Sequence, residues 1–231
     1  LMDLLARIVF NPKEFENGNP LVVERLRYFV KEKDHVASLW AFMENPSPRV
    51  RLHILKFFNF LFSKFPEVVG EAAVSQPESV TLLVEALGDV QEVVRNESLL
   101  LISSLSAVQP EIQKMVAFNG GFETIFRIIR DEGGLGSSVV VNDCLECLLR
   151  LLDGNVQTQR FYREMGLFKH LMELLPLEEG TNLFLLGQPV VNGVSSVMRI
   201  AWKFISHPPG KEDATTIIEN SIAMVRSGFV G

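Results

Sequence analysis

The sequence has few of the residues that build disulfide frameworks and metal centres. It holds two cysteines, Cys144 and Cys147, and four scattered histidines in 231 residues. Two cysteines give no disulfide framework, and they suit a reducing compartment such as the cytosol. A zinc site needs four ligands, and no second cysteine pair accompanies the first. The sequence therefore predicts no metal and no cofactor.

Long apolar runs and runs of basic residues are also missing. No apolar stretch approaches the ~20 residues that a membrane span requires. The 22 basic residues are outnumbered by 28 acidic ones, whereas a track for nucleic-acid phosphates needs a basic stripe. Asp3 and Arg7 interrupt the first ten residues, which argues against a signal peptide there. We therefore expect no membrane-spanning segment and no nucleic-acid partner.

The short motifs of catalysis are absent as well. No serine has the setting of a nucleophile elbow, and there is no Walker-type loop. The Gly-rich stretch 133–136 lacks the Lys and the Ser or Thr that phosphate binding requires, so it predicts a flexible connector between structural units. These absences favour a protein that is not an enzyme.

What the sequence does have is a self-similarity with a period near 45 residues. Apolar residues spaced as on one helix face recur at intervals of 44, 42 and 45 residues. The copies of this pattern begin at Val36, Val80, Phe122 and Leu167. A second apolar pattern has copies that begin at Leu55, Leu99 and Leu145. Two helices that repeat in step at this period are typical of armadillo and HEAT arrays.

The period predicts an all-α, armadillo/HEAT-like α-solenoid of roughly four to five three-helix repeats, in a single domain over residues 1–231. The 47% hydrophobic content is ample for a continuous core. The expected repeat units are 1–45, 48–89, 91–131, 138–176 and 189–231. The main expected helices are 21–31, 34–43, 48–64, 77–88, 91–108, 121–130, 138–153, 166–175, 189–206 and 213–226, with short helices ending near 74 and 164 and one beginning at 110.

The two ends of the chain carry expectations of their own. Residues 1–10 predict the end of a helix, residues 11–19 a loop, and 207–210 a helix stop. Gly228-Phe229 repeats the Gly-apolar start found at 121 and 166, so another helix is expected to begin there. Because the chain opens on Leu and an array needs polar capping repeats, we expect a longer protein with at least one further repeat.

The central repeats resemble a known family. The segments that carry the resemblance are VVRNESLLL (93–101), IQKMVAF (112–118), FE (122–123), DEG (131–133), VVVNDCL (139–145) and FYRE (161–164). In this order they resemble the globular head of the general vesicular transport factors, which are golgin-type tethers of the route between the endoplasmic reticulum and the Golgi. The resemblance covers about residues 48–175 and continues in register over 189–231.

The resemblance implies a non-enzymatic scaffold that binds proteins. It implies an armadillo-like head placed before a coiled coil and an acidic tail, in a parallel homodimer that tethers vesicles. A Rab-type small GTPase, SNARE proteins and golgins are the implied partners. The implied location is cytoplasmic, peripheral on Golgi and transport-vesicle membranes through those partners. The alternative is an armadillo peptide-binding adaptor of the nuclear-import type.

Candidate partner-binding residues lie on the long helices. They are Arg95, Asn96, Glu97, Asn142 and Asp143, which fall at equivalent positions of two successive repeats. Peptide-binding armadillo proteins hold an extended backbone with an Asn ladder, and Asn96 and Asn142 resemble part of one. That ladder belongs to the third helix of a repeat, whereas these residues fall on helices counted as second. Local hydrogen bonding near the helix start is the alternative role.

Two further features are interpreted as packing. Cys144 and Cys147 fall in columns that the sister repeats fill largely with apolar residues, so we expect both thiols to be buried. His170 occupies an otherwise apolar slot of its repeat. We expect a half-buried flanking residue there and not a metal ligand.

Overall fold

The computed structural model describes residues 20–176, 185–206 and 213–228, and in these ranges all regular elements are helices. This confirms the predicted all-α fold. The predictions for residues 1–10, 11–19 and 207–210, and for a helix that begins at Gly228-Phe229, involve residues outside these ranges.

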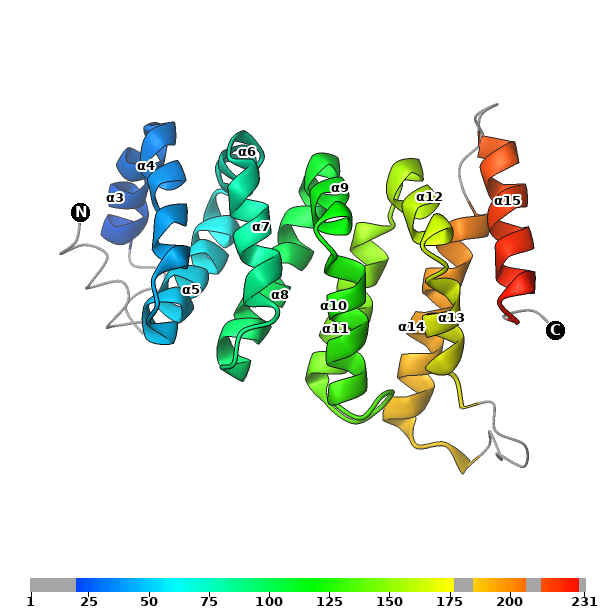
Figure 1. Ribbon diagram of the computed structural model, residues 1–231. Coiled ribbons are helices and arrows are strands. Elements are labelled where there is room, and N and C mark those ends of the chain that lie inside the picture. The colour runs from blue at the N-terminus through cyan, green and yellow to red at the C-terminus, as the bar shows by residue number, and fades with distance from the viewer. Residues whose placement is uncertain (1–19, 177–184, 207–212, 229–231) are drawn as a thin grey trace. The chain divides into compact units, whose positions relative to one another are not determined.

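From α3 to α13 the helices follow one another through short connections (Figure 1). They are α3 (Pro20–Lys31), α4 (Lys33–Ser38), the 3-10 helix η1 (Trp40–Glu44), α5 (Pro48–Lys64), α6 (Pro66–Ser75), α7 (Pro77–Ala86), α8 (Glu92–Val108), α9 (Pro110–Phe118), α10 (Gly121–Asp131), α11 (Val139–Leu151), α12 (Val156–Glu164), α13 (Phe168–Glu173), α14 (Gln188–Ile205) and α15 (Asp213–Arg226). Proline opens five of these helices, because its fixed φ and missing N–H suit the first helical position.

One segment differs from its prediction, because residues 34–43 do not form one helix. α4 ends at Ser38, and the chain continues as η1. The N–H of Phe42 donates to the carbonyl of Leu39 (3.1 Å), three residues back, as in a 3-10 helix. The indole of Trp40 stacks on the ring of Phe58, with centroids 3.8 Å apart. Tertiary packing of this buried indole overrides the helical period here.

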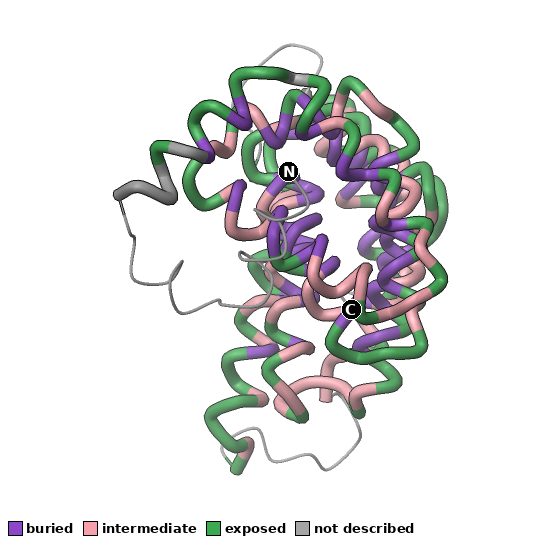
Figure 2. The backbone as a smooth tube through the Cα atoms, turned by 90° about the vertical axis from the view of Figure 1, so that its left-hand side faces the viewer, coloured by how far each residue is buried: buried purple, intermediate pink, exposed green. Residues whose placement is uncertain are grey.

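Contacts between helices group the chain into two compact units, residues 1–108 and 109–231, which we describe separately. In the first unit the long helices α5 and α8 pack along each other, and α6 and α7 both contact α8. In the second unit α11 packs along α14, while α12 contacts α9 and α15. Buried and exposed stretches alternate along the helices of both units (Figure 2), as amphipathic helices in a stack require.

The helices also group in threes. α6, α7 and α8 all contact one another, and so do α9, α10 and α11. In this grouping a repeat reads short, medium, long, and the long helix is the third. Asn96 on α8 and Asn142 on α11 then lie on third helices, not on second ones. The predicted repeat boundaries stay a prediction. The same contacts between helices are compatible with a repeat that begins at the short helix or at the long one.

The Gly-rich connector lies directly against α14. A Cβ atom added at Gly136, whose φ is +80°, would lie 2.7 Å from Cγ2 of Val190 and 2.9 Å from its backbone nitrogen. Glycine is therefore required there both for the backbone angle and for the close approach. The connector is fixed by packing within the second unit and is more than the simple link that composition predicts.

A single tyrosine lies at the centre of the aromatic core of the second unit. Tyr162 is fully buried, and its ring packs against Phe122 of α10, Phe168 of α13 and Phe204 of α14, with centroids 5.1 to 5.3 Å apart. Its hydroxyl donates to the carbonyl of Leu167 (3.1 Å), so the buried polar atom is satisfied. One side chain thus joins α10, α12, α13 and α14.

Buried glutamines connect packed helices in the second unit. Gln113 of α9 donates through Nε2 to the carbonyls of Arg150 (2.7 Å) and Asp153 (3.3 Å) at the end of α11. Gln159, the fourth residue of α12 as Gln113 is of α9, donates to the carbonyls of Leu152 (2.9 Å) and Lys203 (3.3 Å). The last four carbonyls of a helix lack intrahelical partners. The buried side-chain amides of Gln113 and Gln159 act as hydrogen-bond donors to carbonyls at such helix ends.

Replacing Gln159 with Leu should lower the free energy of unfolding by about 1–3 kcal/mol, because the buried hydrogen bond to the Leu152 carbonyl and the partly buried one to the Lys203 carbonyl are lost. Urea denaturation followed by circular dichroism measures this. Gln157→Leu is the control, since Gln157 is exposed on the same helix and should change stability by no more than about 0.5 kcal/mol. Equal effects of the two substitutions would contradict the role of the Gln159 amide.

Candidate interaction surface

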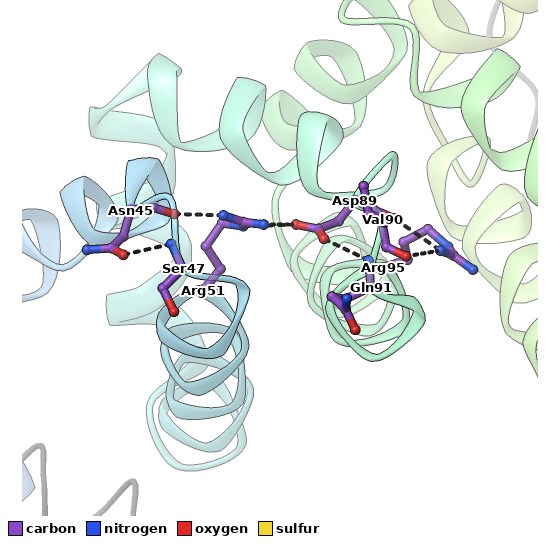
Figure 3. Close-up of polar contacts among 7 residues, drawn as sticks. All are labelled: Asn45, Ser47, Arg51, Asp89, Val90, Gln91 and Arg95. Atoms are coloured by element: carbon purple, nitrogen blue, oxygen red, sulfur yellow. Dashed lines mark hydrogen bonds and ion pairs between the residues drawn. The ribbon is translucent and has the colours of Figure 1, made fainter.

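Arg51 connects two loops at one end of the first unit (Figure 3). From the first turn of α5 it donates through Nη1 to the carbonyl of Asn45 (2.7 Å). Through Nε and Nη2 it also donates to Oδ2 of Asp89, at 2.9 and 2.5 Å. The other carboxylate oxygen of Asp89 accepts the N–H of Gln91 (2.9 Å). The pair therefore ties the loop that precedes α5 to the loop that precedes α8.

The Arg51–Asp89 pair is largely shielded from water. The exposed fractions of the two side chains are 19% and 6%. A two-bond contact between a guanidinium and a carboxylate fixes the orientation of both groups. Because the carboxylate also caps the approach to α8, the pair sets the position of both long-helix starts.

A cavity of about 580 Å³ opens beside this pair. It lies between α7 and the corner where η1 leads into α5. Its lining residues are Met43, Glu44, Asn45, Pro46, Arg51, Glu78, Thr81, Leu82, Glu85, Ala86 and Asp89. The lining thus combines an apolar part with four carboxylates and one guanidinium.

Two of the predicted partner-binding residues hold the fold together. Arg95 donates through Nη1 to the carbonyls of Asp89 (3.0 Å) and Val90 (3.4 Å), so it closes the loop ahead of α8 (Figure 3). Glu97 accepts from Nδ2 of Asn59 on α5, through Oε2 (2.8 Å) and through its carbonyl (3.0 Å). The Arg95 bonds match the alternative role of local hydrogen bonding near the helix start, whereas the Glu97 bonds join α8 to α5. Partner binding by Arg95 and Glu97 stays a prediction.

The other three predicted residues lie at the surface. Asn96 on α8 and Asp143 on α11 are half-buried, and Asn142 is exposed. Partial burial raises the pKa of the Asp143 carboxyl above its ordinary value. All three lie near the starts of their long helices. A partner role for them is also still a prediction.

The interpretation of the cysteines and of His170 as packing residues is confirmed. Cys144 and Cys147 are both fully buried on α11. Burial raises the pKa of the Cys147 thiol to about 12, and it raises the pKa of Cys144 as well. His170 is half-buried, with its ring against Phe126 (5.3 Å between centroids) and its Nδ1 3.0 Å from Oε2 of Glu173.

Searches for a metal site and for a membrane span both give negative results within the described ranges. No three His, Cys, Asp or Glu side chains there come close enough together to hold a metal ion. None of the helices described there is both long and apolar enough to cross a bilayer.

Sequence reasoning missed the acidic cavity and the partner of Arg51. Glu78 and Glu85 stand seven residues apart in the helix predicted over 77–88, so they share one helix face. That spacing was a usable signal. The pairing of Arg51 with Asp89 had none, because it joins residues 38 positions apart outside the apolar pattern.

Similar solved structures define the class of protein. A structure titled "Crystal structure of Uso1-2" matches with a TM-score of 0.78 at 26% identity, covering 89% of this chain and 29% of that one. A designed armadillo repeat protein matches with a TM-score of 0.59 at 14% identity, covering 95% and 91%; this likeness shows the fold alone. The chain is an armadillo-like α-solenoid.

Curated relatives then give the family. "Intracellular protein transport protein USO1" of Saccharomyces cerevisiae is 30% identical over 201 residues, 84% of this chain and 11% of that protein. "General vesicular transport factor p115" of Homo sapiens is 31% identical over 170 residues, 71% of this chain and 18% of that protein. "Golgin candidate 6" of Arabidopsis thaliana is 40% identical over 116 residues, which cover 50% of this chain and 13% of that protein. No family model matches.

The chain belongs to the Uso1/p115 family of vesicular transport factors. The resemblance stated from the central repeats is therefore confirmed. The aligned part of the chain spans between a tenth and a fifth of the length of these relatives: 11% of the yeast protein, 18% of the human one and 13% of the plant one.

Both cysteines should resist thiol reagents in the folded protein at pH 8, because burial excludes the reagent and disfavours the reactive thiolate. A chromogenic disulfide reagent should label neither cysteine in buffer and both in concentrated urea. Rapid labelling of the folded chain would contradict the burial of Cys144 and Cys147.

A double-mutant cycle should show coupling between Arg51 and Asp89. We expect an interaction free energy of about 1–2 kcal/mol from the unfolding of Arg51→Ala, Asp89→Ala and the double variant, because the pair is mostly shielded from water. The exposed pair Arg160–Glu164, an i,i+4 contact on α12, is the control and should give no more than about 0.5 kcal/mol. Equal coupling in the two cycles would overturn this account of the loop connection.

Proposed function

We propose that this chain is part of the protein-binding head of a vesicle-tethering factor that acts in endoplasmic reticulum-to-Golgi and intra-Golgi transport. The observation that carries the proposal is the similarity to the yeast transport protein over 84% of the chain. The all-α repeat fold supports it, since such arrays act by presenting surfaces to partners.

The mechanism proposed is docking without chemistry. Stacked helices bury their apolar faces and hold surface side chains on rigid elements, which keeps a binding surface preorganised. A Rab-type small GTPase, SNARE proteins and golgins are the proposed partners. The exposed Asn142 and the half-buried Asn96 and Asp143 are the proposed contacts. Association with Golgi and vesicle membranes is proposed to run through these partners, and the full-length protein is proposed to be a homodimer.

A nuclear-import type of peptide adaptor is not favoured. Such a groove needs exposed tryptophans in register, and the sequence has two, Trp40 and Trp202. Trp40 is 2% exposed and stacks on Phe58 in the core, so it is not available to a peptide. The relatives are also named as transport factors and not as import receptors.

The immobilised chain should capture more Rab-type GTPase in the GTP-analogue form than in the GDP form, because an effector surface recognises the switch loops ordered by the γ-phosphate. Pull-down with quantitative immunoblotting measures the ratio. Asn96→Ala together with Asp143→Ala should lower capture several-fold, at about 1 kcal/mol or less per contact.

Glu67→Ala is the control for this experiment, since Glu67 is exposed on α6 and away from these residues in sequence. It should leave capture unchanged. Equal capture of the two nucleotide forms would count against the effector proposal.

A further inference from the structure

The cavity beside Arg51 has carboxylates on both of its sides. Glu78 and Glu85 project from one face of α7, and Glu44 ends η1 on the opposite wall. All three are exposed. Asp89 lies deeper, where Arg51 already neutralises it.

The negative charge of the cavity is uncompensated. None of the ion pairs found in the described residues involves Glu44, Glu78 or Glu85. Arg51 is the one basic residue of the lining, and its guanidinium is occupied by Asp89 and by the carbonyl of Asn45. A ligand that enters here therefore meets three carboxylates that no ion pair of the described residues neutralises.

The geometry favours an extended cationic ligand over a metal ion. No three acidic side chains come together closely enough to chelate a metal in the described part of the chain. Residues seven apart on a helix lie about 10 Å apart along its axis, so Glu78 and Glu85 are that far apart. In a peptide with the polyproline-II conformation, residues three apart lie on the same side of the chain and are separated by about 9 Å. Two basic side chains at that spacing match the two carboxylates.

The apolar part of the lining adds to this preference. Met43 and Ala86 are buried, and Leu82 is half-buried beside them. An arginine side chain can lay its methylene stem on such a surface while its planar guanidinium binds a carboxylate through two hydrogen bonds. A simple inorganic cation makes no use of these apolar residues.

We propose that this cavity docks an arginine-containing segment of a partner protein in the polyproline-II conformation, with arginines three positions apart facing Glu78 and Glu85. The charge complementarity and the apolar floor carry the inference. This proposal goes beyond the proposed function. It concerns the chemistry of the bound segment, whereas the proposed function concerns the identity of the partner.

The test uses the purified chain and a fluorescently labelled peptide of sequence Ser-Arg-Gly-Ser-Arg-Gly, with fluorescence anisotropy as the readout. Saturable binding is expected at peptide concentrations up to about 1 mM, and it should weaken as salt rises, because exposed charges are screened. A peptide with citrulline in place of both arginines keeps the shape without the charge. It should bind about tenfold more weakly or worse.

Two matched double variants locate the site. Glu78→Gln with Glu85→Gln should weaken binding of the arginine peptide about 3- to 10-fold, as expected for two exposed ion pairs. Glu24→Gln with Glu67→Gln changes the net charge equally at exposed positions outside the cavity, and it should leave binding unchanged. Circular dichroism of each variant confirms that it is folded.

Three results would overturn the proposal: no saturable binding up to about 1 mM, equal binding of the citrulline peptide, or equal losses in the two double variants. These readouts involve no nucleotide. A failure here is therefore distinguishable from a failure of GTP-dependent capture.

Discussion

Each long helix of this protein has an apolar face that a long helix of a neighbouring repeat covers. α5 packs along α8 in the first unit, and α11 packs along α14 in the second. A single repeat is too small to bury such a face by itself, so the array is stable through nearest-neighbour contacts. The short helices, the loops and the surface residues are positioned as a consequence. Most of the apolar sequence is therefore committed to stacking and is not available for partners.

Polar side chains complete the stack where apolar contact ends. Helix ends leave backbone carbonyls without partners, and the buried amides of Gln113 and Gln159 satisfy such carbonyls on other helices of the second unit. In the first unit, Asn59 on α5 plays a similar part by donating to Glu97 on α8. These bonds have little tolerance for a shift of one helix along another, since a buried amide without a partner is costly. They fix the register that apolar packing alone leaves loose.

The period in the sequence predicted the fold because stacking imposes it. Each apolar face repeats with the unit, so the helices over 48–64 and 213–226 were found at their observed bounds. The break at Leu39 was not predictable, because it follows from stacking of Trp40 on a ring 18 residues away. The same holds for Arg51 and Asp89, which pair across 38 residues. The apolar period in the sequence predicts which face of a helix is buried. It does not predict which polar group on one loop bonds to which polar group on the next loop.

The surface of a repeat array is where a sequence is free to depart from its repeat. Positions in the stack are constrained by the neighbouring helix, whereas exposed positions such as Glu78 and Glu85 are not. The three carboxylates of Glu44, Glu78 and Glu85 around one cavity repel one another, and none of them takes part in an ion pair found among the described residues. Arg95 and Glu97, by contrast, have bonds that the loops need. A cluster of like charges that does not stabilise the fold is a departure of the kind expected at functional sites. For this reason the cavity favours partner binding more strongly than the hydrogen-bonded polar residues of α8 do.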